Sequence, residues 1–270
     1  YFLNTLNIPS TGYNRHFKYL KDVRIPLPPL NIQKKIADTL DKAGELIDKR
    51  KEQISALNKF LENLFLDMFG DPVSNPMGWE KVPVKDFGDV VTGNTPPRAV
   101  EGNYGNYLEW IKSDNINTPY TYLTRATEYL SEEGARKGRV VEKGSVLITC
   151  IAGSLSCIGN VAIADRTVTF NQQINAIVPN TQKITTYFLY NLILNTKKYI
   201  QDSSTKGMKG MISKSTFSQI ELPIASSEQQ AKFVEIFNKF SDLKSNSNKE
   251  LSELDNLFKA LQQKAFSGTL

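Results

Sequence analysis

"RIPLPPLNIQKKIADTLDKAGELID" (residues 24–48) joins a proline-rich hydrophobic stretch directly to a charged helical pattern. "QIELPIASSEQQAKFVEIFNKFSDLKS" (residues 219–245) repeats this junction at a constant offset of 197 residues, without a gap. The identical pairs include Pro26 with Pro223, Gln33 with Gln230, Lys35 with Lys232, Lys42 with Lys239, Leu46 with Leu243 and Leu57 with Leu254. Two amphipathic helices can match in part by chance, but a shared proline lead-in makes chance a poor explanation. An internal repeat is therefore predicted to organise the chain.

Both copies place apolar residues alternately three and four positions apart, the spacing of a coiled-coil seam. The predicted seam consists of Leu40, Ile47, Ile54, Leu57, Leu61, Leu64, Phe237, Leu251, Leu254, Phe258 and Leu261. Polar residues interrupt the seam at matching sites of the repeat. Arg50 aligns with Ser247, and Lys244 aligns with Ile47. A polar residue within a seam usually costs stability and helps to fix the register of the two helices. The first helix leads into residues 71–221 and the second leads away, so helices that pair within the chain must be antiparallel. Two unrelated surface helices on a globular fold are the alternative.

The prolines before each helix have a structural interpretation. Pro26, Pro28 and Pro29 fix φ and remove hydrogen-bond donors, which predicts an extended edge strand that cannot continue into the helix. Asn31 in the first copy, and Ser226 or Ser227 in the second, are the expected N-caps.

Between the helices the pattern changes to short strands separated by turn signals. "GSVLITCIAG" (144–153), "IGNVAIAD" (158–165) and "TVTFNQQINAIVP" (167–179) read as strands, and 185–201 as one helix with a 3.6-residue apolar period. The predicted fold class is α+β: one compact mixed α/β domain plus two long helices forming an antiparallel coiled coil.

Composition narrows the class of protein. The chain has 270 residues, a net charge of +5, two cysteines and one histidine, which leave no material for a disulfide framework and little for a metal site. It has no run of 18 apolar residues, and its first residues lack the pattern of a signal peptide, so no membrane partner and a cytoplasmic location are expected. Both helix regions are neutral, so the positive surplus lies in residues 1–30 and 71–227, which permits nucleic acid as a partner.

Several catalytic classes lack their motifs. The sequence has no GxxxxGK[ST] loop and no glycine-rich dinucleotide fingerprint, and "TPPR" (95–98) lacks the residues of an amino-methyltransferase site. His16 precedes the first helix, so the middle region has no histidine for a catalytic triad. Cys150 and Cys157 lie on or beside apolar strands and are interpreted as structural. The chain is predicted not to be an enzyme by itself.

The two repeated junctions, with "NPMGWEKVPVKDFGDVVTGNTP" (75–96), "YLEWIKSDNI" (107–116), "EKGSVLIT" (142–149), "IGNVAIAD" and "NQQINAIVP" (171–179), resemble the DNA specificity (S) subunits of Type I restriction-modification systems. The resemblance implies a subunit whose target recognition domains each read half of an interrupted DNA sequence, with conserved helices as spacer. It also implies modification (methyltransferase) subunits as partners, and a restriction subunit reached through the complex. S-adenosylmethionine, ATP and Mg would belong to those subunits, with no cofactor in this chain.

On this resemblance, 1–30 looks like the C-terminal remnant of a first target recognition domain and 31–70 like the first spacer helix. Residues 71–225 look like a target recognition domain, and 226–270 like the second spacer helix. A full subunit would carry a further domain upstream. Three explanations stay open: an expressed fragment, a natural half-length subunit that forms a homodimer, or a silent recombination cassette.

The candidate DNA-binding residues come from local chemistry. Polar side chains in loops that follow strands suit base edges, which selects Asn94, Lys112, Ser113 and Asn115, although turns favour the same residue types. Cations suit phosphates, which selects Arg98, Lys206, Lys209 and Lys214. The three lysines lie in a stretch where Gly207 and Gly210 would let the backbone approach a phosphate chain, although a solvated loop has the same composition. The leading hypothesis is a non-catalytic subunit that reads double-stranded DNA. The rival is a coiled-coil interaction protein whose central domain binds protein or carbohydrate.

Overall fold

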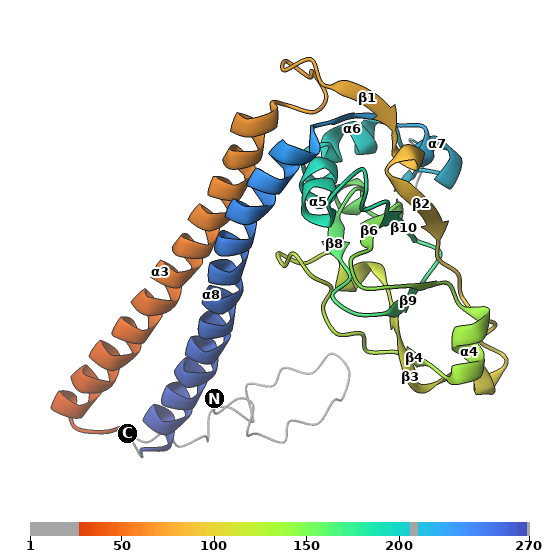
Figure 1. The fold of residues 1–270 in the computed structure, drawn as a ribbon. Coiled ribbons are helices and arrows are strands. Elements are labelled where there is room, and N and C mark those ends of the chain that lie inside the picture. Colours follow the sequence, from red (N-terminus) through yellow and green to blue (C-terminus); the bar gives the residue numbers. More distant parts are fainter. Residues whose placement is uncertain (1–26, 206–209, 269–270) are drawn as a thin grey trace. The chain divides into compact units, whose positions relative to one another are not determined.

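The computed structural model describes residues 27–205 and 210–268 (Figure 1). These residues form two compact units, one made of the chain up to Lys59 together with the chain from Asp242 onward, the other of Phe60–Ser241. The division falls inside both long helices, α3 (Leu30–Phe69) and α8 (Ser227–Ser267), rather than at their ends. The predicted α+β fold with two long helices is confirmed. The assignment of 71–225 as a target recognition domain stays a prediction.

In the first unit, an ion pair between Arg50 of α3 and Glu250 of α8 joins the two helices. The predicted seam residues of this unit, which are Leu40, Ile47, Ile54, Leu57, Leu251, Leu254, Phe258 and Leu261, are buried or half-buried. Leu46, Leu243 and Leu257, which lie outside the predicted seam, are exposed. The polar interruptions are buried as well: Lys244 keeps 7% of its surface and Ser247 keeps 1%.

The helix starts depart in part from the sequence prediction. Helix α3 begins at Leu30, so the expected N-cap Asn31 is wrong, because the turn is closed by the carbonyl of Pro29, which accepts from the amides of Ile32 and Gln33. Helix α8 begins at Ser227, and the hydroxyl of Ser226 accepts from the amide of Gln229 at 3.4 Å, as an N-cap does. Of the first proline segment, Pro26 lies outside the described residues and Leu27–Pro29 form no strand. The second forms strand β12 (Glu221–Ile224), which pairs antiparallel with β1 (Glu80–Pro83).

In the second unit, the C-terminal end of α3 packs against the N-terminal end of α8. Phe60 contacts Phe240 with ring centroids 4.3 Å apart, and Phe65 contacts Phe233 at 5.6 Å, so the two segments run antiparallel. Phe65 and Phe188 of α5 (Thr186–Asn195) are 5.6 Å apart. These aromatic contacts bind the helix ends to the domain core, which explains why the unit boundary cuts the helices.

The described residues of the second unit form four small sheets. Strands β2, β10, β6 and β8 form an antiparallel sheet in that order, and β4, β3, β9 and β5 form a mixed sheet in which β3 and β9 are parallel. Strands β11 and β7 make a third sheet, and β1 and β12 the fourth. The strands span Gly88–Thr92 (β2), Tyr104–Ile111 (β3), Tyr129–Leu130 (β4), Val140–Val141 (β5), Val146–Thr149 (β6), Ile151–Ala152 (β7), Val161–Ile163 (β8), Val168–Phe170 (β9), Ile174–Pro179 (β10) and Gly210–Met211 (β11). The short helices are α4 (Glu132–Lys137), α6 (Lys197–Asp202), α7 (Lys214–Ser218), η1 (Val84–Asp86), η2 (Glu101–Asn103), η3 (Ser113–Asn115) and η4 (Leu155–Cys157).

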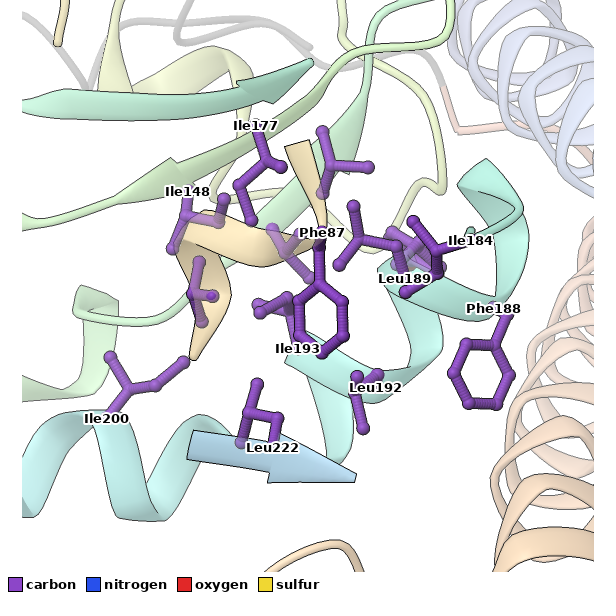
Figure 2. Packing of buried hydrophobic residues seen from close by; sticks show 14 of the residues in the cluster. Phe87, Ile148, Ile177, Ile184, Phe188, Leu189, Leu192, Ile193, Ile200 and Leu222 are labelled. Atoms are coloured by element: carbon purple, nitrogen blue, oxygen red, sulfur yellow. The ribbon is translucent and has the colours of Figure 1, made fainter. Parts of the chain in front are cut away.

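The four-stranded antiparallel sheet separates two parts of the core. Because side chains alternate along a strand, Ile148 and Ile177 face the larger cluster while Leu147 and Ala176 face a second one. Figure 2 shows Ile148 and Ile177 in the same cluster as Leu189, Leu192 and Ile193 of α5. A third, small cluster contains Trp110, Leu130 and Ala135, and this one supports the candidate site.

Three predicted elements are divided in the structure. The strand expected over 144–153 becomes β6 and β7, which lie on either side of Cys150. The helix expected over 185–201 ends at Asn195 and resumes at Lys197, because the hydroxyl of Thr196 donates to the carbonyls of Leu192 and Ile193 and its backbone leaves the helical region. The stretch 167–179 forms two strands, β9 and β10, with a turn at Asn171, whose side chain accepts from the amide of Gln173. Within the described ranges, no helix is long and apolar enough to cross a membrane.

Candidate nucleic-acid interface

Strand β3 places a buried indole beneath the candidate residues. Trp110 keeps 3% of its surface, and its ring nitrogen donates to the carbonyl of Asn94 at 3.2 Å. The ring of Tyr104, at the other end of β3, meets the indole edge-on at 6.0 Å, and its hydroxyl donates to the carbonyl of Pro96 at 2.8 Å. The segment that follows β2 is thus held across the aromatic side chains of β3.

Two predicted cations converge on one carboxylate above these rings. The guanidinium of Arg98 donates to Glu128 at 2.7 Å, and the ammonium of Lys112 donates to the other oxygen of Glu128 at 2.5 Å. The guanidinium carbon lies 4.8 Å from the ring centre of Tyr104 and 5.2 Å from that of Trp110, while the Lys112 nitrogen lies 5.3 Å from the latter. Both cations are therefore positioned by aromatic rings as well as by charge. We call Arg98, Lys112, Glu128, Trp110 and Tyr104 the arginine–glutamate cluster.

The electrostatics of this cluster favour its charged form. Hydrogen bonds from Lys112 and then Arg98 hold the pKa of the Glu128 carboxyl below its usual range. The hydrogen bond to Glu128 in turn raises the pKa of Arg98. With two cations and one carboxylate, the cluster keeps a net positive charge. The Arg98 side chain remains 56% exposed, so its unused N–H donors are accessible.

Asn94 is engaged within the protein. Its side-chain nitrogen donates to the carbonyl of Lys137 at 2.8 Å, and its side-chain oxygen accepts from the amide of Arg139 at 2.8 Å. The preceding residue, Gly93, passes so close to Asn171 that a Cβ on it would lie 2.1 Å from the Asn171 carbonyl oxygen. Both polar groups of the Asn94 amide therefore tie the loop to the end of α4.

Asn115 closes the loop after β3 from inside. It is 6% exposed; its side-chain oxygen accepts from the amide of Lys112 at 3.0 Å, and its nitrogen donates to the carbonyl of Arg125 at 3.0 Å. This geometry favours a structural role for Asn115, and its contact with DNA stays a prediction. Ser113 lies half-buried at the first position of η3.

The predicted phosphate-binding lysines are not brought into this cluster. Lys206 and Lys209 lie outside the described residues. Lys214 is exposed at the start of α7, whose Phe217 packs into the larger core cluster rather than against Trp110. Its predicted role stays a prediction.

A buried ion pair between Glu109 and Arg166 supports the loop that joins β3 to β4. Glu109, 6% exposed, binds Arg166, which also donates to the carbonyl of Thr124 at 2.9 Å. Burial by itself raises the pKa of Glu109, but the hydrogen bond and charge of Arg166 outweigh it and hold that pKa below its usual value. The pair fixes the loop between β3 and β4, at whose end Glu128 lies.

Cysteine chemistry has little support in the described part of the chain. Burial raises the pKa of the Cys150 thiol to about 12, and the side-chain nitrogen of Asn175 lies 3.2 Å from its sulfur. Such a thiol is not a nucleophile at neutral pH, as the sequence predicts. No group of three or more His, Cys, Asp or Glu suited to a metal ion occurs among the described residues.

Sequence reasoning missed three members of the cluster. Trp110 and Tyr104 lie in or near the quoted "YLEWIKSDNI", where an aromatic beside Lys112 was an available signal. Glu128, in "RATEYL", showed no such signal in the sequence. It lies 30 positions from Arg98, and the two side chains come into contact only in the folded protein.

Comparison with known proteins gives a consistent match. The family model described as "Type I restriction modification DNA specificity domain" matches residues 2–59 and 76–256. The specificity subunit of the type I restriction enzyme MjaIX of Methanocaldococcus jannaschii is 30% identical over 186 residues, which are 67% of this chain and 42% of that protein. The HindI specificity subunit of Haemophilus influenzae is 31% identical over 191 residues, 67% of this chain and 40% of that protein. The chain thus spans less than half the length of these two relatives.

Solved structures agree in fold. The type I restriction-modification S subunit of M. genitalium has a TM-score of 0.62 at 18% identity, over 92% of this chain and 64% of that one. A chain from a study of complex assembly and conformational transition in the type I R-M system also has a TM-score of 0.62, at 21% identity over 99% of this chain and 67% of that one. At these identities the likeness supports the fold alone.

Proposed function

We propose, because this chain belongs to the family of type I restriction modification DNA specificity domains, that it recognises a DNA sequence for a type I restriction-modification complex. The observation that carries the proposal is the arginine–glutamate cluster. It presents an accessible guanidinium, fixed on aromatic rings, in the unit that contains most of the matched residues. Charged donors of this kind bind both base edges and phosphates of duplex DNA.

The chain acts in this proposal as a non-catalytic reader. The two curated relatives are named specificity subunits, a term that separates them from the subunits that perform chemistry. Modification subunits would then supply S-adenosylmethionine-dependent methylation, and a restriction subunit the ATP- and Mg-dependent cleavage. In this proposal the protein binds cellular DNA and acts in the cytoplasm.

The two long helices have a separate task in the proposal. Paired antiparallel segments with buried seams are rigid elements, suited to holding a recognition domain at a fixed distance from a second one. The second domain would come from a further part of the same polypeptide or from a second copy of this chain. The alternative function, binding of protein or carbohydrate by the central domain, gains no support from the family match.

The test is a salt-dependent binding measurement on the full chain together with its modification subunits, using fluorescent duplex DNA. Binding that weakens linearly in log–log form with salt, and that prefers one sequence over random duplex, is expected. Absence of binding at low salt, together with no co-purification of modification subunits, contradicts the proposal.

A further inference from the structure

The arginine–glutamate cluster sets donors and an acceptor side by side. Within residues 27–205 and 210–268, Arg98 donates only to Glu128, through one terminal nitrogen, so further N–H groups of its fork are available to donate. One carboxylate oxygen of Glu128 accepts a hydrogen bond from Arg98 and the other accepts one from Lys112. Each of the two oxygens therefore keeps a lone pair that can accept a further hydrogen bond. The exposed edge of the cluster thus carries a donor fork next to an acceptor.

This arrangement matches one kind of base pair. In the major groove guanine presents two acceptors, O6 and N7, and its partner cytosine presents the N4 donor beside them. We propose that Arg98 and Glu128 together read a G·C base pair, with Arg98 donating to guanine and Glu128 accepting from cytosine. The inference rests on the proposed DNA recognition and names what this site reads.

An A·T pair fits the cluster less well. Adenine offers one acceptor, N7, next to its N6 amino donor, so it cannot accept both N–H groups of an arginine fork. Thymine offers an acceptor and a methyl group where Glu128 requires a donor. The selection therefore comes from both members of the Arg98–Glu128 pair.

Glu128 also argues against a phosphate at this position. A phosphate bound by Arg98 would lie close to the negative carboxylate, 2.7 Å from the same guanidinium, and would be repelled by it. A phosphate-binding arginine is better placed without an acid. In this proposal Arg98 contacts a base, whereas its sequence context suggests a phosphate contact.

The cluster is held firmly enough for such readout. The backbone amide of Trp110 donates to the carbonyl of Glu128 at 3.0 Å, which fixes the acid at the entrance to β4. Lys112, 28% exposed, bridges the acid from the other side. Trp110 and Lys112 are positioning residues here, and a preorganised pair loses less side-chain entropy on binding.

The protein offers a matched control on α4. Arg136 and Glu132 form an exposed ion pair one helical turn apart, at 2.5 Å, with both side chains more than 60% exposed. Glu132→Gln removes the same charge from another arginine, outside the arginine–glutamate cluster.

The test is selection of a randomised duplex library by the full chain with its modification subunits, followed by sequencing. The wild type is expected to enrich a motif that contains G·C at one position where Glu128→Gln lowers the preference roughly tenfold, while other positions and the salt slope stay unchanged. Glu132→Gln is expected to keep the whole motif. Arg98→Lys, which keeps the charge but loses the fork, is expected to lose preference at the same position as Glu128→Gln.

The outcomes separate the two proposals. A wild-type motif that Glu128→Gln and Arg98→Lys leave intact overturns the G·C inference while DNA recognition stands. A uniform loss at all positions in either folded variant, checked by an unchanged melting temperature, also overturns it. If the wild type enriches no motif, the proposed function itself fails.

Discussion

Gln33 and Gln230, which are equivalent in the internal repeat, make the same hydrogen bond at the start of their helices. Each side-chain nitrogen donates to the carbonyl five residues earlier, that of Pro28 at 2.7 Å and that of Ala225 at 2.9 Å. The repeat thus preserves the chemistry by which the chain enters each long helix, beyond the apolar spacing of the seams.

The two glutamines are expected to differ in their contribution to stability. Gln230 is 1% exposed, accepts from the amide of Thr185 at 2.9 Å and donates to the carbonyl of Lys183 at 3.1 Å. Gln33 is half-buried, and its side chain bonds only to Pro28 among the residues that the structure describes. Gln230→Ala should lower the unfolding free energy by about 2–3 kcal/mol, since it leaves buried groups unpaired, and Gln33→Ala by about 1 kcal/mol or less. Urea titration followed by circular dichroism measures both. Equal effects would contradict the assignment.

Lys244 is expected to cost stability in the seam. It is 7% exposed, burial lowers its pKa, and its repeat equivalent is the buried Ile47. Lys244→Ile should raise the unfolding free energy by about 1–2 kcal/mol, because it replaces a poorly solvated charge by apolar packing. Lys249→Ile, on the exposed side of the same helix, is the control and should gain nothing. A destabilised Lys244→Ile variant would indicate that the ammonium has a required partner.

The Glu109–Arg166 pair predicts a specific response to acid. Because the folded pKa of Glu109 lies below its ordinary value of 4.5, its stabilisation is complete above that value and is lost as the pH falls through the lowered pKa. Glu109→Gln should cost about 1.5–3 kcal/mol at pH 7, and this difference from wild type should shrink as the pH falls below 4.5. Thermal unfolding measured from about pH 7 down to about pH 3, a range that includes the ordinary carboxyl pKa values, tests this. A difference independent of pH would show that the carboxylate charge is unimportant.

Lys206 and Lys209 are predicted to contact phosphates. Replacing both by alanine should weaken binding to all duplex sequences alike and reduce the slope of log affinity against log salt by about 2. Lys198→Ala is the control, since this exposed lysine already pairs with Asp202 at 2.8 Å. An unchanged slope in the double variant removes both lysines from the interface.

Periodic features were predictable from the sequence, and contacts between distant residues were not. The helices expected over 31–70 and 226–270 span Leu30–Phe69 and Ser227–Ser267. The heptad pattern is local, so the stretch of sequence over which it continues indicates the length of the helix. The break at Thr196 was not predicted. Its hydroxyl donates to a carbonyl of the preceding turn, and the spacing of apolar residues does not reveal such a bond.

The candidate site was predicted in part for the same reason. Arg98 and Lys112 were selected separately and meet in the fold through Glu128, which local chemistry could not select. Asn115 was selected as a polar loop residue, but asparagine is favoured in turns for its bonds to the backbone, and such bonds occupy its side chain here. Polarity in a loop therefore does not separate a residue that faces a ligand from one that closes the loop.

The adenine methylation map of the source genome, read with this reading frame intact, deleted and restored, tests the central claim most directly. A sequence-reading subunit predicts that one interrupted motif loses methylation on deletion and regains it on restoration, with all other motifs unchanged. A methylation map that is identical in the three strains would contradict the account.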